Sequence, residues 1–262
     1  MITSTANNSV KYVRSLYRRR VRCGERVFVA EGLRTVEEAL KAGMQPAFLF
    51  HTSAVLGSPR AKALVSRAGE RGARISVVSD SVMAAMADTV TPSGILAVLP
   101  MPAASFPPPS HWVLILDRVR EPGNLGTILR AALAAGVELV VTTGGTVDVY
   151  SPKVVRAAMG AHFRLNLWVD RDWTEAAKAL SGLHVLVASP QRGASYWEVN
   201  WCQPTALVIG GEAEGAAAEA EQLATGYVTI PMRSEVESLN AAMAASVLLF
   251  EAARQRFQAS LA

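Results

Sequence analysis

The chain has 262 residues, of which 50% are hydrophobic, and its formal net charge is +4. This length can bury one large or two medium cores, so it favours two domains and excludes a chain too poor in apolar residues to fold. The longest nearly unbroken apolar run, residues 241 to 250, is too short to span a bilayer, and the first nine residues lack the apolar core of a signal peptide. We therefore expect a cytoplasmic protein with no membrane-spanning part.

The first part of the chain is basic. Residues 1 to 105 hold 14 Lys and Arg against 7 Asp and Glu, whereas residues 106 to 262 hold 12 against 15. One short segment concentrates the basic side chains that we expect to contact a polyanion: Lys11, Arg14, Arg18, Arg19, Arg20 and Arg22. The alternative is a solvated helix face, because Val10, Val13 and Leu16 recur near helical spacing and would bury the opposite side.

Short apolar runs and helical patterns alternate through the rest of this part. Strands are expected at residues 26–30, 47–51, 75–78 and 95–99, and helices at residues 35–42 and 59–69. These elements predict a small α/β domain over residues 1–105. Five prolines then fall between residues 100 and 109, which excludes a helix or an interior strand there and predicts a linker at about residues 100–110.

Strand and helix patterns alternate more clearly after the linker. Strands are expected at residues 112–116, 139–143, 165–169, 184–188, 206–209 and 227–231, and helices at residues 126–135, 152–159, 173–180, 216–223 and 238–257. Such alternation predicts a mostly parallel sheet with helices on both faces. Residues 106–262 are therefore expected to form a second α/β domain.

Several signatures of common enzyme classes are absent from the sequence. Cys23 and Cys202 stand at no metal-ligand spacing, so we expect two reduced, packed thiols. The four histidines share no short spacing and are expected to be structural or surface residues. The chain also lacks the glycine-rich dinucleotide signature, the P-loop, the serine hydrolase elbow and the zinc protease motif. We predict no metal site.

The segment of residues 116–132 joins a strand to a helix through a turn that contains proline and glycine. Asn124 is expected in the loop, and Arg130 within the first two turns of a helix that starts near Gly126. Such a loop can direct an amide and a guanidinium toward one pocket. Taken alone, the same residues also fit a turn asparagine and a solvent-facing arginine.

Two strands near the end of the chain break into glycine, proline or small polar residues. The first leads into residues 210–215, Gly-Gly-Glu-Ala-Glu-Gly. The second leads into residues 230–232, Ile-Pro-Met, and is followed by residues 238–240, Ser-Leu-Asn. A buried parallel strand that stops in this way leaves backbone groups free to bind a ligand.

Together these pieces resemble the three motifs of the SpoU/TrmH class of SPOUT RNA methyltransferases. The first motif of the class carries an asparagine and, six residues on, an arginine, which is the spacing of Asn124 and Arg130. The second motif, Gly-x-Glu-x-x-Gly, matches residues 210–215. The third, Ile-Pro-Met followed by Ser-Leu-Asn, matches residues 230–232 and 238–240.

The resemblance implies a catalytic domain with a trefoil knot over residues 106–262. A small substrate-binding domain precedes it, and residues 28–40 look like the opening of that domain in the family. The resemblance also implies S-adenosylmethionine as the cofactor and RNA as the polyanion. Six positions would hold the cofactor: Ile209, Gly210, Gly211, Ile230, Met232 and Leu239. Without the family pattern these positions are typical of ordinary strand core.

The reaction of this class is the attack of a ribose 2′-hydroxyl on the sulfonium methyl group. A neutral hydroxyl is a weak nucleophile, so the site must align it and help to remove its proton. The family often gives the base role to the arginine, here Arg130, but a guanidinium resists deprotonation. We therefore expect Arg130 to grip an RNA phosphate and orient the hydroxyl, with the proton passing to the phosphate or to water. The residues expected to position these groups are Asn124, Glu212, Ser238 and Asn240.

A basic domain ahead of the knot is typical of the ribosomal RNA methyltransferases of the family, so 23S-type ribosomal RNA is the expected substrate. A transfer RNA 2′-O-ribose methyltransferase is one alternative, and a noncatalytic RNA-binding protein that keeps the knot is another. The family also implies a homodimer. The last expected helix would contribute apolar side chains to its interface or to packing: Leu239, Met243, Val247, Phe250 and Phe257.

Overall fold

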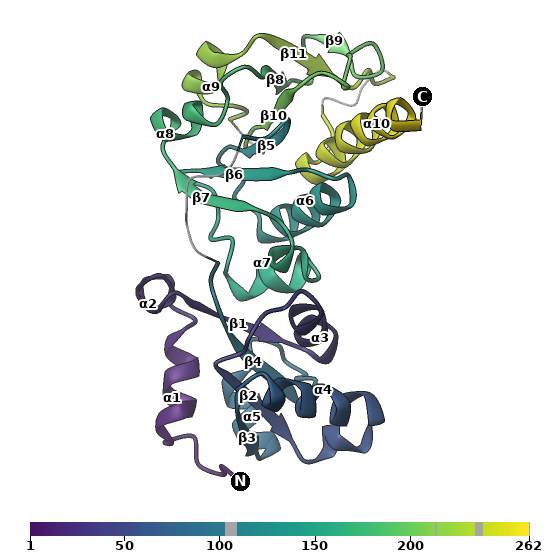
Figure 1. Ribbon diagram of the computed structural model, residues 1–262. Helices are drawn as coiled ribbons and strands as arrows, with labels where there is room; N and C mark the ends of the chain where they lie inside the picture. The colour runs from purple at the N-terminus through teal and green to yellow at the C-terminus, as the bar shows by residue number, and fades with distance from the viewer. Residues whose placement is uncertain (103–108, 213, 234–237, 262) are drawn as a thin grey trace. The chain divides into compact units, whose positions relative to one another are not determined.

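The computed structural model describes residues 1–262 except 103–108, 213, 234–237 and 262 (Figure 1). Chain contacts divide it into two compact units, Met1–Ala103 with Tyr150–Phe163, and Ala104–Val149 with Arg164–Ala262. The expected boundary at residues 105/106 therefore differs from the structure in one respect, because residues 150–163 belong to the first unit. Most of the expected linker falls on residues 103–108, outside the described residues.

The first unit contains a four-stranded sheet in the order β1-β4-β2-β3. Its strands are β1 (Val27–Glu31), β2 (Phe48–Thr52), β3 (Arg74–Val78) and β4 (Ile95–Pro100). Strands β1 and β2 run antiparallel to β4, and β3 runs parallel to β2. The helices of this unit are α1 (Asn8–Ser15), α2 (Arg19–Glu25), α3 (Leu33–Lys41), η1 (Ala54–Gly57), α4 (Pro59–Glu70), α5 (Asp80–Met86), α7 (Pro152–Ala157) and η2 (Ala161–Phe163).

The basic segment at the start of the chain forms two helices rather than one. Helix α1 ends at Ser15, and Arg18 has an extended backbone before α2 begins. Val10, Val13 and Leu16 are fully buried in a core that also contains residues of β2 and β4. The opposite side is solvated, so this segment has the two faces that its apolar spacing predicts.

The structure corrects one residue of the expected polyanion contacts. Lys11, Arg14 and residues 18–20 are exposed. The Arg22 side chain, in contrast, is only 3% exposed, and its Nη1 donates a hydrogen bond to the Leu16 carbonyl oxygen at 2.5 Å. The prediction for Arg22 is therefore wrong in this structure, because a buried guanidinium that binds its own backbone cannot reach a phosphate.

An aromatic cluster ties residues 150–163 to the first unit. The ring of Phe28 in β1 lies 5.0 Å from that of Tyr150 and 6.2 Å from that of Phe163, measured between centroids. An ion pair of 3.2 Å joins Arg156 of α7 to Asp88. The aromatic contacts explain why residues 150–163 belong to the first unit, although their position in the sequence predicted the second.

The second unit contains a seven-stranded sheet in the order β7-β6-β5-β10-β8-β11-β9. Its strands are β5 (Trp112–Leu116), β6 (Leu139–Thr143), β7 (Leu167–Arg171), β8 (His184–Ala188), β9 (Ala194–Ser195), β10 (Thr205–Ile209) and β11 (Gly226–Thr229). All neighbouring pairs are parallel, which confirms the predicted parallel sheet. The carboxyl ends of all these strands therefore meet at one edge.

Helices cover both faces of this sheet (Figure 1). They are α6 (Pro122–Ala134), α8 (Trp173–Lys178), α9 (Ala218–Leu223) and α10 (Ala241–Leu261). Val113 and Ile115 of β5 share a core with Ala176 of α8 and Ala220 of α9. Because strand side chains alternate in direction, the intervening residues face the opposite side, where α6 and α10 pack together. Central strands buried on both faces explain the continuous apolar runs.

Cys23 and Cys202 are both free and exposed, so the prediction of packed thiols is wrong. Two of the four histidines are buried and two are exposed, as expected for structural or surface residues. Among the described residues, no group of three or more His, Cys, Asp or Glu side chains is placed to hold a metal ion. Within the same residues, no helix is both long and apolar enough to cross a bilayer.

Replacement of the Phe28 ring tests the aromatic cluster. We expect Phe28→Ala to lower the free energy of unfolding by about 3–5 kcal/mol, the usual cost of removing a buried aromatic side chain. Val90→Ala is the control, because Val90 is an apolar side chain that is fully exposed. Urea unfolding monitored by circular dichroism measures both, and equal losses in the two variants would contradict the packing role of Phe28.

Candidate active site

Three segments meet at the carboxyl edge of the second sheet: the loop after β10, the residues after β11 and the residues just before α10. They border a cavity of about 570 Å³. Small-molecule sites typically measure about 300–1,000 Å³. All six positions expected to hold the cofactor line this cavity: Ile209, Gly210, Gly211, Ile230, Met232 and Leu239. The topology of the sheet therefore gathers positions that the sequence separates by up to 30 residues.

Sequence reasoning missed a further wall of the cavity. Ser189, Pro190 and Gln191 line it directly after β8. The signal was available, because β8 is a third apolar strand that ends in a small polar residue and a proline, as the two motif strands do. Since β8 lies between β10 and β11 in the sheet, its carboxyl end must lie between theirs.

The two glycines after β10 allow a close approach of backbone rather than of ligand. A Cβ atom on Gly210 would lie 2.3 Å from the Ala216 nitrogen, and one on Gly211 would lie 2.6 Å from the Arg118 carbonyl oxygen. Gly211 and Gly215 also exchange two backbone hydrogen bonds of 3.1 and 3.0 Å. The loop thus closes on itself against the segment after β5, and any larger side chain would force it open.

Glu212 connects this loop to the other two motifs. One of its carboxylate oxygens accepts a hydrogen bond from Asn124 Nδ2 at 2.8 Å, and the other accepts one from the Arg120 backbone nitrogen at 3.2 Å. Asn124 Oδ1 in turn accepts a hydrogen bond from Asn240 Nδ2 at 3.0 Å. A single chain of polar contacts therefore runs from the second motif through the first to the third.

The environment of Glu212 keeps its carboxyl ionised. Partial burial raises the pKa of this group, but the hydrogen bonds from Asn124 and from nearby backbone N–H groups favour the charged form and outweigh burial. The pKa therefore lies below its usual value. At neutral pH Glu212 is an acceptor only, and it places a negative charge on the wall of the cavity.

Both asparagines stand at the beginning of a helix. Asn240 Oδ1 accepts hydrogen bonds from the Ala242 and Met243 nitrogens at 2.9 and 3.3 Å, so Asn240 caps α10. Helix α10 therefore starts at Ala241, three residues later than expected. Helix α6 starts earlier than expected, at Pro122, which places Asn124 in its first turn and not in a loop. The side chains of Asn124 and Asn240 are nevertheless hydrogen-bonded to each other and, through Asn124, to Glu212.

The two remaining expected residues have different positions. Ser238 is exposed and lines the cavity. Arg130 is exposed on α6 and does not line it. Six residues along an α-helix correspond to about 9 Å and a turn of roughly 120°, so Arg130 and Asn124 lie on different faces of α6. Within the part of the chain that the structure describes, the exposed Arg130 has no hydrogen-bond or ion-pair partner.

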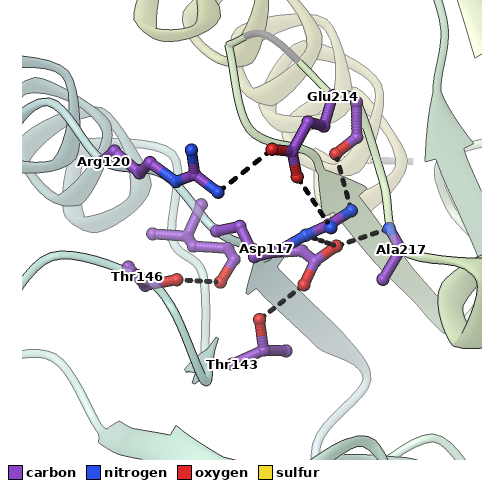
Figure 2. A network of polar contacts seen from close by, with 9 residues as sticks. Asp117, Arg120, Thr143, Thr146, Glu214 and Ala217 are labelled. Carbon is purple, nitrogen blue, oxygen red and sulfur yellow. Dashed lines mark hydrogen bonds and ion pairs between the residues drawn. The ribbon is translucent and has the colours of Figure 1, made fainter.

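A buried carboxylate fixes the far end of the loop (Figure 2). Asp117, directly after β5, is 1% exposed. Its two oxygens accept hydrogen bonds from Thr143 Oγ1 at 2.5 Å and from the Ala217 nitrogen at 2.6 Å. The loop of residues 210–217 is thus held at both ends, by Glu212 and by Asp117.

The residues of the cavity fit S-adenosylmethionine. Ile230, Met232 and Leu239 supply apolar surface for a flat heterocycle, and Gly210 lines the same cavity. The ionised Glu212 favours a positively charged sulfonium by Coulomb attraction. The donor set therefore suits a ligand with an aromatic ring at one end and a cation near the other.

Comparisons with known proteins agree with this geometry. Residues 111–250 match the SpoU rRNA Methylase family, and residues 7–97 match the MRM3-like substrate binding domain. An uncharacterized tRNA/rRNA methyltransferase of Synechocystis sp. is 36% identical over 99% of this chain and 95% of its own length. The 23S rRNA (guanosine(2553)-2'-O)-methyltransferase RlmP of Bacillus subtilis is 33% identical over 95% of this chain and 97% of its own.

Solved structures give the same answer. The AdoMet-bound rRNA methyltransferase from Sinorhizobium meliloti superposes with a TM-score of 0.85 at 29% identity, and the match covers 97% of each chain. The trefoil knot implied by the resemblance stays a prediction. The family match spans more than half of the sequence and includes all three motifs, and the chain therefore belongs to the SpoU rRNA methylase family.

Proposed function

We propose that this protein transfers the methyl group of S-adenosylmethionine to a ribose 2′-hydroxyl of RNA, with 23S-type ribosomal RNA as the substrate. The observation that carries the proposal is the single cavity lined by all six expected cofactor positions and bordered by the polar chain through Glu212. Support for a ribosomal substrate comes from the names of the Bacillus subtilis and Sinorhizobium meliloti relatives and from the MRM3-like domain.

The bound cofactor would supply an electrophilic methyl group on a sulfonium. The residues of the chain would do the rest. Ile230, Met232 and Leu239 hold the heterocycle, while Glu212 fixes Asn124 and so the start of α6. Arg130, exposed on that helix, binds an RNA phosphate and orients the attacking hydroxyl, whose proton passes to the phosphate or to water. Transfer RNA is the second candidate substrate, since the Synechocystis relative is described as a tRNA/rRNA methyltransferase.

Of the predictions on function, the first tests this reaction and the role of Arg130 together. We expect the full chain to methylate unmodified 23S ribosomal RNA and not transfer RNA, and to bind S-adenosylhomocysteine in calorimetry. Arg130→Ala should abolish transfer but keep that binding, because Arg130 lies outside the cavity. Arg130→Lys should not restore transfer, because lysine lacks the planar two-pronged donor.

Mass spectrometry of digested RNA measures methyl transfer. Arg192→Lys is the matched control, because Arg192 is an exposed arginine of the same unit that pairs with Glu221. A lysine variant at position 130 that turns over at the wild-type rate would contradict the positioning role. Methylation of transfer RNA alone would replace the ribosomal substrate by the alternative.

We also propose that the exposed basic side chains of the first unit grip RNA. Lys11 and Arg14 are exposed and three residues apart on α1, whose buried residues are Val10 and Val13, and the exposed Arg18 follows in extended backbone before α2. Arg19 and Arg20 extend the exposed basic surface into α2. Arg22 is left out of this set because it is buried. The net negative charge of residues 106–262 makes the first unit the main source of phosphate contacts.

The second prediction concerns this basic surface. Replacing Arg18, Arg19 and Arg20 together by Gln should weaken RNA binding and lower the slope of log affinity against log salt by about 0.7–0.9 for each phosphate that the protein no longer neutralises. Filter binding of 23S ribosomal RNA across a salt series measures both effects. The control removes the same charge from α4 through Arg60, Lys62 and Arg67. If the triple arginine variant keeps the wild-type salt slope, these arginines do not contact phosphates and form only a solvated surface.

A homodimer through α10 completes the proposal. Met243, Phe250 and Phe257 are 58%, 53% and 66% exposed and are spaced seven residues apart, so they share one face of the helix. Large apolar side chains arranged in this way are typical of a surface that another chain covers. A second copy of the chain is the partner that the family resemblance implies.

The third prediction follows from that apolar face. Light scattering should report a dimer at micromolar concentration, and the double variant Phe250→Glu, Phe257→Glu should be a folded monomer, because charges are costly inside an apolar interface. Leu223→Glu, which alters an exposed leucine of α9, should leave the dimer intact. A wild-type protein that stays monomeric would reject the interface.

A further inference from the structure

A second cavity, of about 310 Å³, lies beside the cofactor cavity and shares the wall residues Gly211, Glu212 and Glu214 with it. Its remaining lining residues are Arg118, Arg120 and Glu121. The side chains of the two arginines have no role in the site described above. Two guanidinium groups at one opening are suited to bind an oxyanion, because each offers several donors in a fixed plane.

One carboxylate holds both guanidinium groups. Arg118 Nη1 lies 3.0 Å from one oxygen of Glu214. Arg120 Nη2 lies 3.2 Å from the other oxygen (Figure 2). The Glu214 side chain is 52% exposed and that of Arg120 is 62% exposed. Water and salt therefore screen these pairs, which makes them weak and exchangeable. A more highly charged anion can take the place of Glu214.

Arg118 is fixed in position, unlike Arg120. Its backbone has φ 58°, a left-handed value that few residues other than glycine adopt. Its Nε lies 3.6 Å from the buried Asp117 carboxylate, and its Nη2 donates a hydrogen bond to the Gly215 carbonyl oxygen at 3.4 Å. Among the described residues, its Nε–H has no hydrogen-bond acceptor. That Nε is buried, so the part of Arg118 that a ligand can reach is Nη1, which Glu214 holds in the free protein.

Arg120 links this cavity to the polar chain of the site. Its backbone nitrogen donates to Glu212, the carboxylate that also binds Asn124, while its side chain reaches Glu214. An anion bound by the Arg120 side chain is therefore held by a residue whose backbone contacts Glu212, and Glu212 in turn binds Asn124 at the start of α6. RNA bound at the cofactor cavity would bring its phosphates to this rim.

We propose that Arg118 and Arg120 form a phosphate subsite for the RNA substrate, which Glu214 occupies in the free protein and vacates when RNA binds. The inference rests on the proposed function and names a substrate contact within it. Glu121 and Glu212 border the same cavity and repel an anion, so a phosphate enters only when the third carboxylate, that of Glu214, moves away. Glu214 therefore acts as an internal competitor that lowers the affinity for weakly bound RNA.

The experiment compares full-length Arg120→Gln, Glu214→Gln and the double variant with wild type. Filter binding of unmodified 23S ribosomal RNA should show a loss of affinity for Arg120→Gln of up to about fivefold, the range of one exposed ion pair. Its salt slope should fall by about 0.7–0.9. Glu214→Gln should bind RNA more tightly than wild type, and the double variant should not show that gain because its source is the same arginine.

Arg192→Gln and Glu221→Gln are the matched controls, because they form an exposed ion pair elsewhere in the second unit. Neither should change RNA binding. If Glu214→Gln binds RNA as wild type does, or more weakly, Glu214 is not a competitor and the proposal is overturned. An Arg120→Gln variant with wild-type affinity and slope overturns it as well.

A second arm separates the two sources of an oxyanion near this rim, because the methionine part of the cofactor carries a carboxylate. Calorimetry compares S-adenosylhomocysteine, which has that carboxylate, with methylthioadenosine, which lacks it. The proposal expects Arg120→Gln to leave both affinities near wild type. A selective loss for S-adenosylhomocysteine would make the cofactor, not RNA, the ligand of Arg120. Wild-type protein that binds neither compound would instead refute the proposed function itself.

Discussion

The carboxylate of Glu212 holds together three stretches of chain on which the site depends. It accepts a hydrogen bond from Asn124, 88 residues away, and Asn124 accepts one from Asn240, 116 residues further along the chain than Asn124 itself. Asn240 caps α10 and Asn124 lies in the first turn of α6, so this polar chain also sets where two packed helices begin. Loss of its central carboxylate would leave donors without partners and free both helix ends to shift.

The parallel sheet explains why these residues meet at all. Every strand of the second unit ends at one edge, so loops from β5, β8, β10 and β11 converge there whatever their distance in the sequence. Convergence crowds the backbone, and Gly210 and Gly211 relieve the crowding where the loop folds back on Ala216 and on Arg118. The cavity is the space left between these loops and the start of α10.

Local sequence patterns predicted the strands of the sheet more accurately than they predicted the side-chain contacts. The expected bounds of β5, β6 and β8 coincide with the observed ones, because unbroken apolar runs between polar residues define a buried strand. Helix α5 and the two-residue strand β9 were missed, and β9 is too short to show a period. The cavity positions were found only through the family motifs. Burial of Arg22 and the pairing of Glu214 with two distant arginines arise from tertiary contacts that no short segment encodes.

The return of residues 150–163 to the first unit has a consequence for how this protein can be divided. The chain passes between the two units at three places, near residues 103, 149 and 163, rather than once. A single cut in the proline-rich segment therefore separates neither unit as a whole. The C-terminal fragment would keep residues 150–163, whose aromatic side chains Tyr150 and Phe163 would lose their contacts with Phe28. Transplanting the small unit onto another enzyme would require two grafts, and a circular permutant would have to open the chain elsewhere.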